Sequence, residues 1–216
     1  MTVLVMASGK GGVSKTTTSV QLAVCLITHG VSVALVPADK NRDIPNWNEK
    51  RAKLGYAPVP VIDGYGNVEK AIDAAARIAD VVIVDCAGHD SEESRLALLR
   101  ADIFVTPVKP SSDLEVESLT DVTATARKAQ ANNPSLKPYI LLTRIKHNRL
   151  SYAVSLTKEL KSDPVWLPVL KTRISELDVF EDCTNAGAGV HEAARASSLG
   201  KAKAQIELLA AELNLI

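Results

Sequence analysis

A glycine-rich segment near the start of the chain could enclose phosphate groups. It reads Gly9-Lys10-Gly11-Gly12-Val13-Ser14-Lys15-Thr16. Glycines let the backbone fold closely around an anion with its N–H groups pointing inward, and the first turn of a following helix adds a favourable dipole. In such a loop the second lysine, here Lys15, reaches the β- and γ-phosphates, and the hydroxyl of Thr16 ligates Mg²⁺. The segment therefore predicts binding of ATP with Mg²⁺.

One position of this segment departs from the general phosphate-loop pattern. Ser14 occupies the place where G-x-x-x-x-G-K-[ST] has a glycine. The alternative interpretation is a tight turn between a strand and a helix, with no ligand. Such a turn does not require lysines on both sides of the glycines, as Lys10 and Lys15 stand here. Phosphate binding is therefore the preferred interpretation.

An acid stands where a second metal ligand is expected. Asp85 directly follows the apolar run Val81-Val82-Ile83-Val84, so its carboxylate should emerge at the carboxyl end of a buried strand, beside the phosphate loop. A carboxylate at this position, known as Walker B, holds Mg²⁺ directly or through a water molecule. The alternative is an aspartate that only caps the next segment. We expect Thr16 and Asp85 to hold the metal together.

The elements that must position these residues alternate in type along the chain. We expect strands at 2–6, 31–36, 81–84, 103–106, 139–143 and 165–167. We expect helices at 16–28, 47–54, 68–79, 92–99, 113–131 and 150–160, and then two C-terminal helices, the last at 190–213. This alternation predicts an α/β fold, a doubly wound, mainly parallel sheet in three α/β/α layers, formed by one P-loop domain over 1–216 with ligands at the carboxyl ends of the strands.

The composition agrees with this fold. Of the 216 residues, 46% are hydrophobic and only 4% aromatic, so the core must consist mainly of aliphatic side chains, as it does where helices cover both faces of parallel strands. Three widely spaced cysteines predict neither a disulfide framework nor a metal cluster and fit a reducing cytoplasm. The chain has neither a run of about 18 apolar residues nor a basic leader segment, so we expect it to be cytoplasmic, without a membrane span.

The first glycine-rich segment also carries a family resemblance. The run Lys10-Gly11-Gly12-Val13-Ser14-Lys15-Thr16-Thr17 resembles the deviant Walker A box of ParA/MinD-type ATPases, and most of all that of the small plasmid-partition ParA (ParF-like) proteins. This box accepts a residue other than glycine before the second lysine. In that family the first lysine, here Lys10, reaches the phosphates bound by the partner subunit. The resemblance therefore implies an ATP-dependent homodimer, nucleotide contacts from Gly9 to Thr17, and catalytic roles for Lys10 and Lys15, because cations offset charge on the transferred phosphoryl group.

The resemblance also assigns roles to the loops after two strands. Asp39 lies where the family has its switch I acid, which orients the attacking water and helps to hold the metal. The chain departs from the family at Pro37, where another aspartate is frequent, and at Lys40-Asn41, where Pro-Gln is frequent; a solvated loop acid is the alternative. The stretch Ala87-Gly88-His89 resembles switch II. We expect His89 to be a solvated loop residue, since this chemistry needs no imidazole base.

Contacts with the adenine base are implied in two places. The loop from Thr106 to Leu114, with Pro107, resembles the proline-containing loop beside the adenine and the dimer interface in small ParA proteins; a plain proline loop is the alternative. Thr143 and Arg144 end a further strand and fall where the family contacts the base.

Basic residues are concentrated between 137 and 173. Between 137 and 173 there are eight basic and two acidic residues, a net of +6, in a chain whose 25 basic and 25 acidic residues balance. A solvated basic face is one interpretation. The other is a binding surface for DNA phosphates. Such contacts position the protein on DNA without reading its sequence, and the binding weakens as the salt concentration rises. The candidate residues are Arg144, Lys146, Arg149, Lys171 and Arg173.

These features favour a ParA-type ATPase that dimerises with ATP, binds nonspecific DNA on the nucleoid, and partitions a plasmid or chromosome with a ParB- or ParG-like adaptor that stimulates hydrolysis. A protein cargo such as a carboxysome is an alternative. A MinD-like membrane-surface ATPase is another, although the C-terminal segment Gln205–Leu213 has acidic polar positions. An iron–sulfur reductase would need paired cysteines, and Cys86 and Cys183 are isolated.

Overall fold

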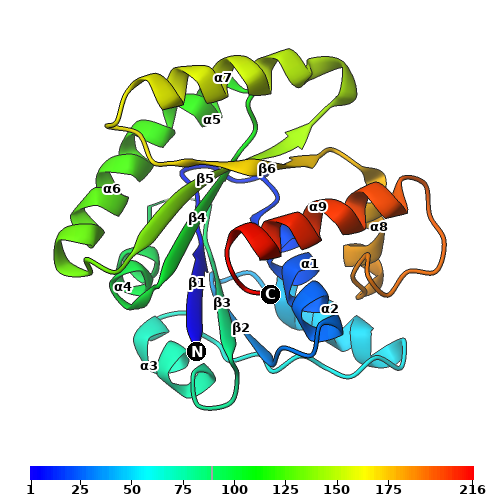
Figure 1. Cartoon of the computed structure of the whole chain (residues 1–216). Helices are drawn as coiled ribbons and strands as arrows, with labels where there is room; N and C mark the ends of the chain where they lie inside the picture. The colour runs from blue at the N-terminus through cyan, green and yellow to red at the C-terminus, as the bar shows by residue number, and fades with distance from the viewer. Residues whose placement is uncertain (89) are drawn as a thin grey trace.

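The computed structural model describes residues 1–88 and 90–216 and is built around a parallel β-sheet (Figure 1). Its strands are β1 (Thr2–Met6), β2 (Val33–Ala38), β3 (Val81–Cys86), β4 (Ile103–Val108), β5 (Lys137–Ile145) and β6 (Val169–Ser175). They lie in the order β2-β3-β1-β4-β5-β6, and each pair of neighbours is parallel. From β1 the sheet extends one way through β3 and the other way through β4, so the loop after β1 lies at the point where ligands bind in doubly wound folds.

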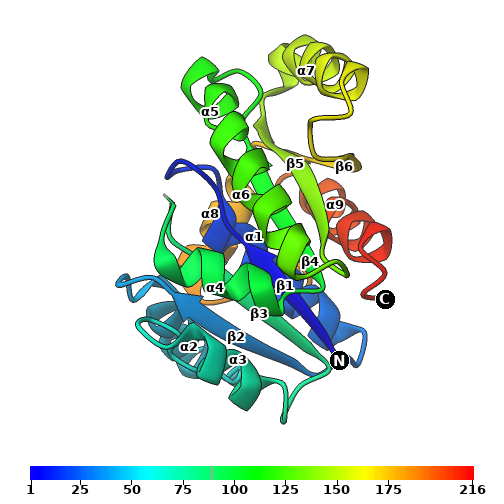
Figure 2. The ribbon, with the colours of Figure 1, turned by 90° about the vertical axis from the view of Figure 1, so that its left-hand side faces the viewer.

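Helices cover both faces of the sheet. They are α1 (Lys15–Thr28), α2 (Asp43–Lys53), α3 (Val68–Ala75), α4 (Glu92–Arg100), α5 (Asp113–Glu117), α6 (Leu119–Asn132), α7 (Leu150–Ser162), α8 (Asp178–Ala186) and α9 (Leu199–Glu212), with a short 3-10 turn at His147–Arg149. One layer contains α3, α4, α6 and α7, and the other α1, α2, α8 and α9 (Figures 1 and 2). The predicted three-layer α/β/α fold is confirmed.

The central strand shows why the sequence forms this sandwich. In β1, Val3 and Val5 pack into the core on the α3/α4 side, whereas Leu4 and Met6 pack into the core on the α1/α9 side. Side chains of a strand alternate between faces, so a strand covered by helices on both sides must be apolar throughout. The aliphatic runs that predicted buried strands are therefore the middle layer of the fold.

Several predicted boundaries are wrong; for example, α2 begins at Asp43 rather than at 47, and α3 ends at Ala75 rather than at 79. The run at 165–167 lies between Pro164 and Pro168 and forms a turn, in which the Trp166 N–H donates to the carbonyl of Asp163; the strand is β6, whose alternating polar residues concealed it. The last helix starts at Leu199 rather than at 190. The helix expected at 113–131 is divided at Ser118 into α5 and α6.

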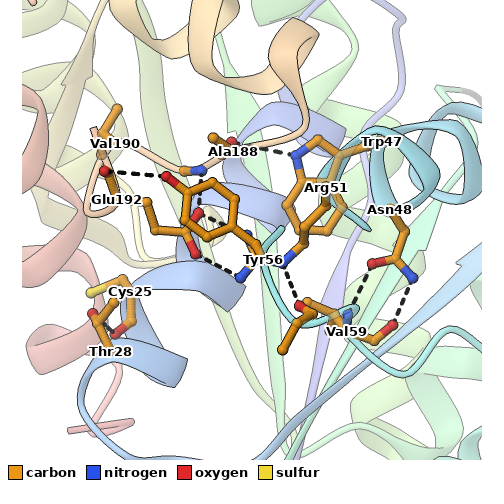
Figure 3. Close-up of polar contacts among 12 residues, drawn as sticks. Cys25, Thr28, Trp47, Asn48, Arg51, Tyr56, Val59, Ala188, Val190 and Glu192 are labelled. Atoms are coloured by element: carbon orange, nitrogen blue, oxygen red, sulfur yellow. Dashed lines mark hydrogen bonds and ion pairs between the residues drawn. The ribbon is translucent and has the colours of Figure 1, made fainter. Parts of the chain in front are cut away.

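A buried ion pair fastens α2 to the loop that follows α8 (Figure 3). The side chain of Arg51 is 3% exposed and forms two hydrogen bonds, of 2.7 and 2.6 Å, with the carboxylate of Glu192. Its Nε donates to the carbonyl of Ala57 at 2.8 Å. The rings of Trp47 and Tyr56 lie 5.5 and 5.1 Å from the guanidinium carbon. Two segments more than a hundred residues apart in sequence thus share one polar cluster.

Within the described residues, no helix is both long enough and apolar enough to cross a bilayer.

Candidate nucleotide site

The phosphate loop runs from the end of β1 to the first residue of α1 and uses left-handed backbone at two positions. Gly12 has φ 79°, and Ser14 has φ 67° and ψ 30°. Glycine adopts such angles freely, whereas other residues lose about 1–2 kcal/mol there. The position of Ser14 is the one where the general pattern has glycine, and the structure gives the reason. Ser14 keeps the turn at the cost of strain that a glycine would not carry.

Lys15 lies inside the loop rather than in solvent. It is 8% exposed, and its Nζ donates to Ser8 Oγ at 3.1 Å. The Ser8 hydroxyl in turn donates to the carbonyl of Lys10 at 2.6 Å. Burial lowers the pKa of Lys15, and the nearby Asp85 carboxylate opposes this effect. An anion at the loop would therefore meet a poorly hydrated ammonium group, for which a phosphate is a strong partner.

The two expected metal ligands lie together. Thr16 Oγ1 donates to Asp85 Oδ2 at 2.6 Å, and Ser19 Oγ donates to Asp85 Oδ1 at 3.1 Å. Burial raises the pKa of Asp85 to about 6, and the hydrogen bonds from Thr16 and Ser19 and the charge of Lys15 work against that rise. A hydroxyl and a carboxylate beside a phosphate site are the hard oxygen donors that Mg²⁺ prefers. The residues present fit Mg²⁺.

A cavity of about 870 Å³ opens over the first turn of α1. From the loop, it is lined by Gly12, Ser14, Lys15, Thr16 and Thr17. Its other walls come from the ends of β5 and β6 and from α8. The N-terminal turn of a helix leaves backbone N–H groups without intrahelical partners, so it attracts anions. The cavity is in the range that small-molecule sites occupy.

Thr143 lies beneath the phosphate loop and contacts Val13, a residue of that loop. Thr143 is fully buried, and its hydroxyl donates to the carbonyl of Val13 at 3.0 Å. Neither residue lines the cavity over α1. The structure therefore places Thr143, which was expected to contact the base, underneath the phosphate loop.

Arg144 faces the cavity and holds the loop. It has a left-handed backbone conformation, with φ 51°. Its Nη1 donates to the carbonyl of Gly12 at 2.7 Å, and its Nη2 donates to Glu176 Oε1 at 3.0 Å. Lys146 Nζ lies 3.7 Å from the other oxygen of Glu176. The hydrogen bond and charge of Arg144 and the charge of Lys146 outweigh burial and lower the pKa of Glu176.

Lys10 and Gly9 lie on the other side of the loop. Lys10 is exposed, has no ion pair among the described residues, and lines a second cavity instead of the one over α1. A Cβ on Gly9 would come within 2.8 Å of Ser118 Cβ. A Cβ on Gly88 would come within 2.8 Å of the Gly11 backbone. Close packing against the loop thus requires glycine at both positions.

The remaining expected residues are more dispersed. Asp39 is half-exposed, lines a third cavity beside α2, and accepts a hydrogen bond from Asn41 Nδ2 at 3.3 Å. Its charge is close enough to oppose ionisation of Asp85. Pro107 lies within β4, where it is buried and paired with Leu141, rather than in the loop after the strand. His89 lies outside the described residues.

The basic candidates divide into two groups. Arg144 and Lys146 are turned toward Glu176 at the cavity, so the structure does not support them as free cations for DNA. Arg149 lies over the Tyr152 ring, at 5.5 Å from its centroid. On the edge strand β6, Lys171 is exposed, and Arg173 is half-buried with its Nη2 3.4 Å from Thr157 Oγ1.

Sequence reasoning did not single out Ser8, Ser19 or Glu176. The signal for Ser19 was present, because a residue three positions after Thr16 lies on the same helix face. Glu176 directly follows β6. Because that strand was placed several residues too early, Glu176 was not expected at the edge of the sheet.

The fold and this site define the chain as a P-loop NTPase of the ParA/MinD type. The family model described as "VirC1 protein" matches residues 1–213. The chain belongs to the VirC1 family.

Individual relatives are consistent with this family. ParA of Rhizobium radiobacter is 34% identical over 116 residues, 52% of this chain and 50% of that protein, so the chain matches only half of that relative's length. Protein virC1 of Rhizobium rhizogenes is 25% identical over 186 residues, which cover 83% of this chain and 79% of that protein. Among solved structures, a putative plasmid partition protein from Borrelia burgdorferi bound to AMPPNP aligns with a TM-score of 0.68 and 19% identity, covering 100% of this chain and 99% of that one.

Proposed function

We propose that the protein is a partition-type ATPase that binds MgATP, dimerises with it, and binds nonspecific DNA while an adaptor of the ParB or ParG kind promotes hydrolysis. The observation that carries the proposal is that Lys15 and Thr16 line the cavity over α1 and that Thr16 donates its hydroxyl to the buried Asp85. Bound Mg²⁺ would neutralise charge on the β- and γ-phosphates. Lys15 holds the phosphates, Asp85 keeps the Thr16 hydroxyl in place, and Asp39 is the candidate that orients water.

Lys10 is proposed to act on the nucleotide of a second subunit. It is exposed and lies outside its own nucleotide cavity, which leaves its ammonium group available to another molecule. We expect Lys10→Ala to retain ATP affinity within about threefold, because the contacts of the loop with the nucleotide of its own subunit are unchanged. We expect the rate of hydrolysis to fall roughly 100-fold, which is the effect of removing one cation from a phosphoryl-transfer site. The ATP dependence of steady-state turnover gives the hydrolysis rate and the apparent affinity, and sedimentation with ATP gives the self-association.

The matched control for this variant is Lys70→Ala, an exposed lysine on α3. It should leave turnover and self-association unchanged. Wild-type turnover together with normal ATP-dependent association in Lys10→Ala would refute the role in trans.

DNA binding is assigned to two cations of the edge strand β6, the exposed Lys171 and the half-buried Arg173. The double variant Lys171→Glu/Arg173→Glu changes the local charge by four units, and each removed phosphate contact lowers the salt dependence. We expect DNA affinity at low salt to fall at least tenfold, with ATP affinity of the monomer unchanged. Gel shifts with ATP, with ADP and without nucleotide, across a salt series, give the measurement.

The experiment tests both the control of DNA binding by nucleotide and the DNA-binding surface itself. A Lys50→Glu/Lys53→Glu variant on α2 makes the same charge change elsewhere on the surface. Equal DNA affinity in the β6 variant and the wild type would reject the DNA-binding surface, and equal DNA affinity with and without ATP would reject nucleotide control.

A further inference from the structure

Residues 189–192, in the connection between α8 and α9, are fastened to several helices. The Val190 N–H donates to Gln21 Oε1 of α1 at 2.7 Å. Nε2 of His191 lies 3.2 Å from Glu207 Oε1 of α9. These two helices pack against each other (Figure 1), and the buried ion pair described above ties the same connection to α2. The connection therefore holds the back of α1 in place.

His191 is buried in a setting that suits only its neutral ring. Its side chain is 6% exposed. Because a carboxylate oxygen only accepts hydrogen bonds, Nε2 carries a hydrogen and donates to Glu207. Nδ1 is then the acceptor of the neutral ring, and it is buried with no hydrogen-bond partner within the described residues. A proton on Nδ1 would be a buried donor without an acceptor, which is costly.

The charged groups around His191 act in opposite directions. Glu207 of α9 favours a protonated ring, whereas Lys203 of α9 and His29 at the end of α1 disfavour it. Burial raises the pKa of the Cys25 thiol of α1, beside Glu207, to about 12, so this thiol stays neutral. Burial outweighs Glu207 and lowers the pKa of His191 below its ordinary value. The folded protein therefore takes up this proton less readily than an opened chain does.

We propose that His191 is an acid-sensitive latch, which holds residues 189–192 against α1 and α9 when neutral and releases them when protonated. An imidazolium here must turn its Nδ1–H toward water, because no acceptor for it lies within the part of the chain that the structure describes. The turn displaces both neighbours of His191. One is Val190, which donates to Gln21, and the other is Glu192, the acid of the buried ion pair.

Release of the connection would reach the cavity over α1. Gln21 lines that cavity, and its Nε2 donates at 3.0 Å to Thr184 of α8, which lines the cavity too. Loss of the Val190 N–H leaves Gln21 with one of its anchors missing, so the wall of the cavity is held less firmly. Protonation of His191 and nucleotide binding would then be coupled. This coupling rests on the proposed function, whereas the latch itself does not.

Acid should open the latch, and linkage gives the size of the effect. A histidine whose pKa is lowered in the closed state contributes stability that is complete above its ordinary pKa of about 6.5 and is lost as the pH falls below it. For one group, the equilibrium constant for opening rises by at most about tenfold per pH unit. Between about pH 7.5 and about pH 5.5 we expect a rise of roughly fivefold.

The test is native-state hydrogen exchange of the full chain without nucleotide, followed by NMR at these two pH values. After correction for the intrinsic exchange rate, the Val190 amide of the wild type should be about fivefold less protected at the lower pH. His191→Gln can still donate to Glu207 but does not titrate, so it should show no such fall. Glu207→Gln removes the charge that favours protonation and should deepen the fall. The Ser94 amide on α4, which donates to the Ser91 hydroxyl, is the internal reference.

The matched control is His29→Gln, which removes an exposed histidine at the end of α1 and should retain most of the fall. The proposal is overturned if the wild-type Val190 amide is equally protected at both pH values, or if the fall persists in His191→Gln. An equal fall at Ser94 would also overturn it, because the titration would then act on the whole fold.

ATP titration of the wild type and of His191→Gln at the same two pH values tests the coupling. Acid lowers ATP affinity in both proteins through Asp85, whose pKa is raised to about 6. The wild type should lose about fivefold more affinity than His191→Gln. Equal losses would overturn the coupling. A lack of ATP binding in both proteins at both pH values would refute the proposed function and leave the hydrogen-exchange result standing.

Discussion

Lys15→Ala is expected to lose at least roughly 100-fold in ATP affinity, on the order of 3 kcal/mol, the effect of removing one partner from a desolvated charge pair. The ammonium group is buried and its pKa is lowered by that burial, with the acid Asp85 opposing. In the wild type a γ-phosphate would replace Ser8 as the partner of this group. In the variant the phosphates would face a loop without its central charge. Isothermal titration with ATP and Mg²⁺ gives the affinity.

The fold should survive this substitution. A buried ammonium group whose strongest contact is a hydroxyl contributes little to the free energy of unfolding, because its burial removes it from water. We therefore expect the melting temperature without nucleotide to change by no more than a few degrees, and ATP to stabilise the wild type but not the variant. Lys70→Ala on α3 is the control and should titrate as the wild type does. Retained micromolar affinity in Lys15→Ala would refute the assignment of the phosphate loop.

The parts of the site that sequence could predict are those fixed by local chemistry. The order of residues from Gly9 to Thr16 indicates both the left-handed turns, which the structure shows at Gly12 and Ser14, and the proposed phosphate and metal contacts. The position of Asp85 was predictable because a buried parallel strand is apolar until its carboxyl end, and the first acid of the run, which lies within β3, stands at that end.

The parts that could not be predicted depend on contacts between distant segments. Arg144 follows a strand, and the sequence alone allows it to face DNA, the base or the loop. Its contact with Gly12 is fixed by the pairing of β5 with β6, which brings Glu176 beside it. The strand β6 was misplaced because an edge strand with one polar face has a weak apolar pattern.

The same limit applies to the cluster around Arg51, whose sequence context indicates only an exposed helix with basic residues. Arg51→Ala is expected to lower the free energy of unfolding by about 3–5 kcal/mol, because Glu192 would be left buried without its partner. With roughly 2–4 °C per kcal/mol for a chain of this size, the melting temperature should fall by about 6–20 °C. Urea unfolding followed by circular dichroism gives the free energy.

Two controls separate the buried pair from a general effect of losing arginine. Arg95→Ala removes an exposed pair with Asp90 and should cost no more than about 1 kcal/mol. Arg51→Met/Glu192→Leu removes both charges and keeps apolar volume, so it should recover much of the stability that Arg51→Ala loses. If Arg51→Ala lowers the free energy of unfolding by less than about 1 kcal/mol, the pair contributes as little as a surface ion pair does.

The consequence for the site follows from what the cluster holds. Glu192 also accepts the Gly189 N–H at 3.0 Å, and the next residue, Val190, donates its N–H to Gln21 of α1 at 2.7 Å. Gln21 lines the cavity over α1, and it belongs to the same helix whose first turn is the proposed phosphate site. Loss of Arg51 should therefore loosen the back of α1 and weaken ATP binding. A variant that lost stability while retaining wild-type ATP affinity would show that the cluster supports the fold alone.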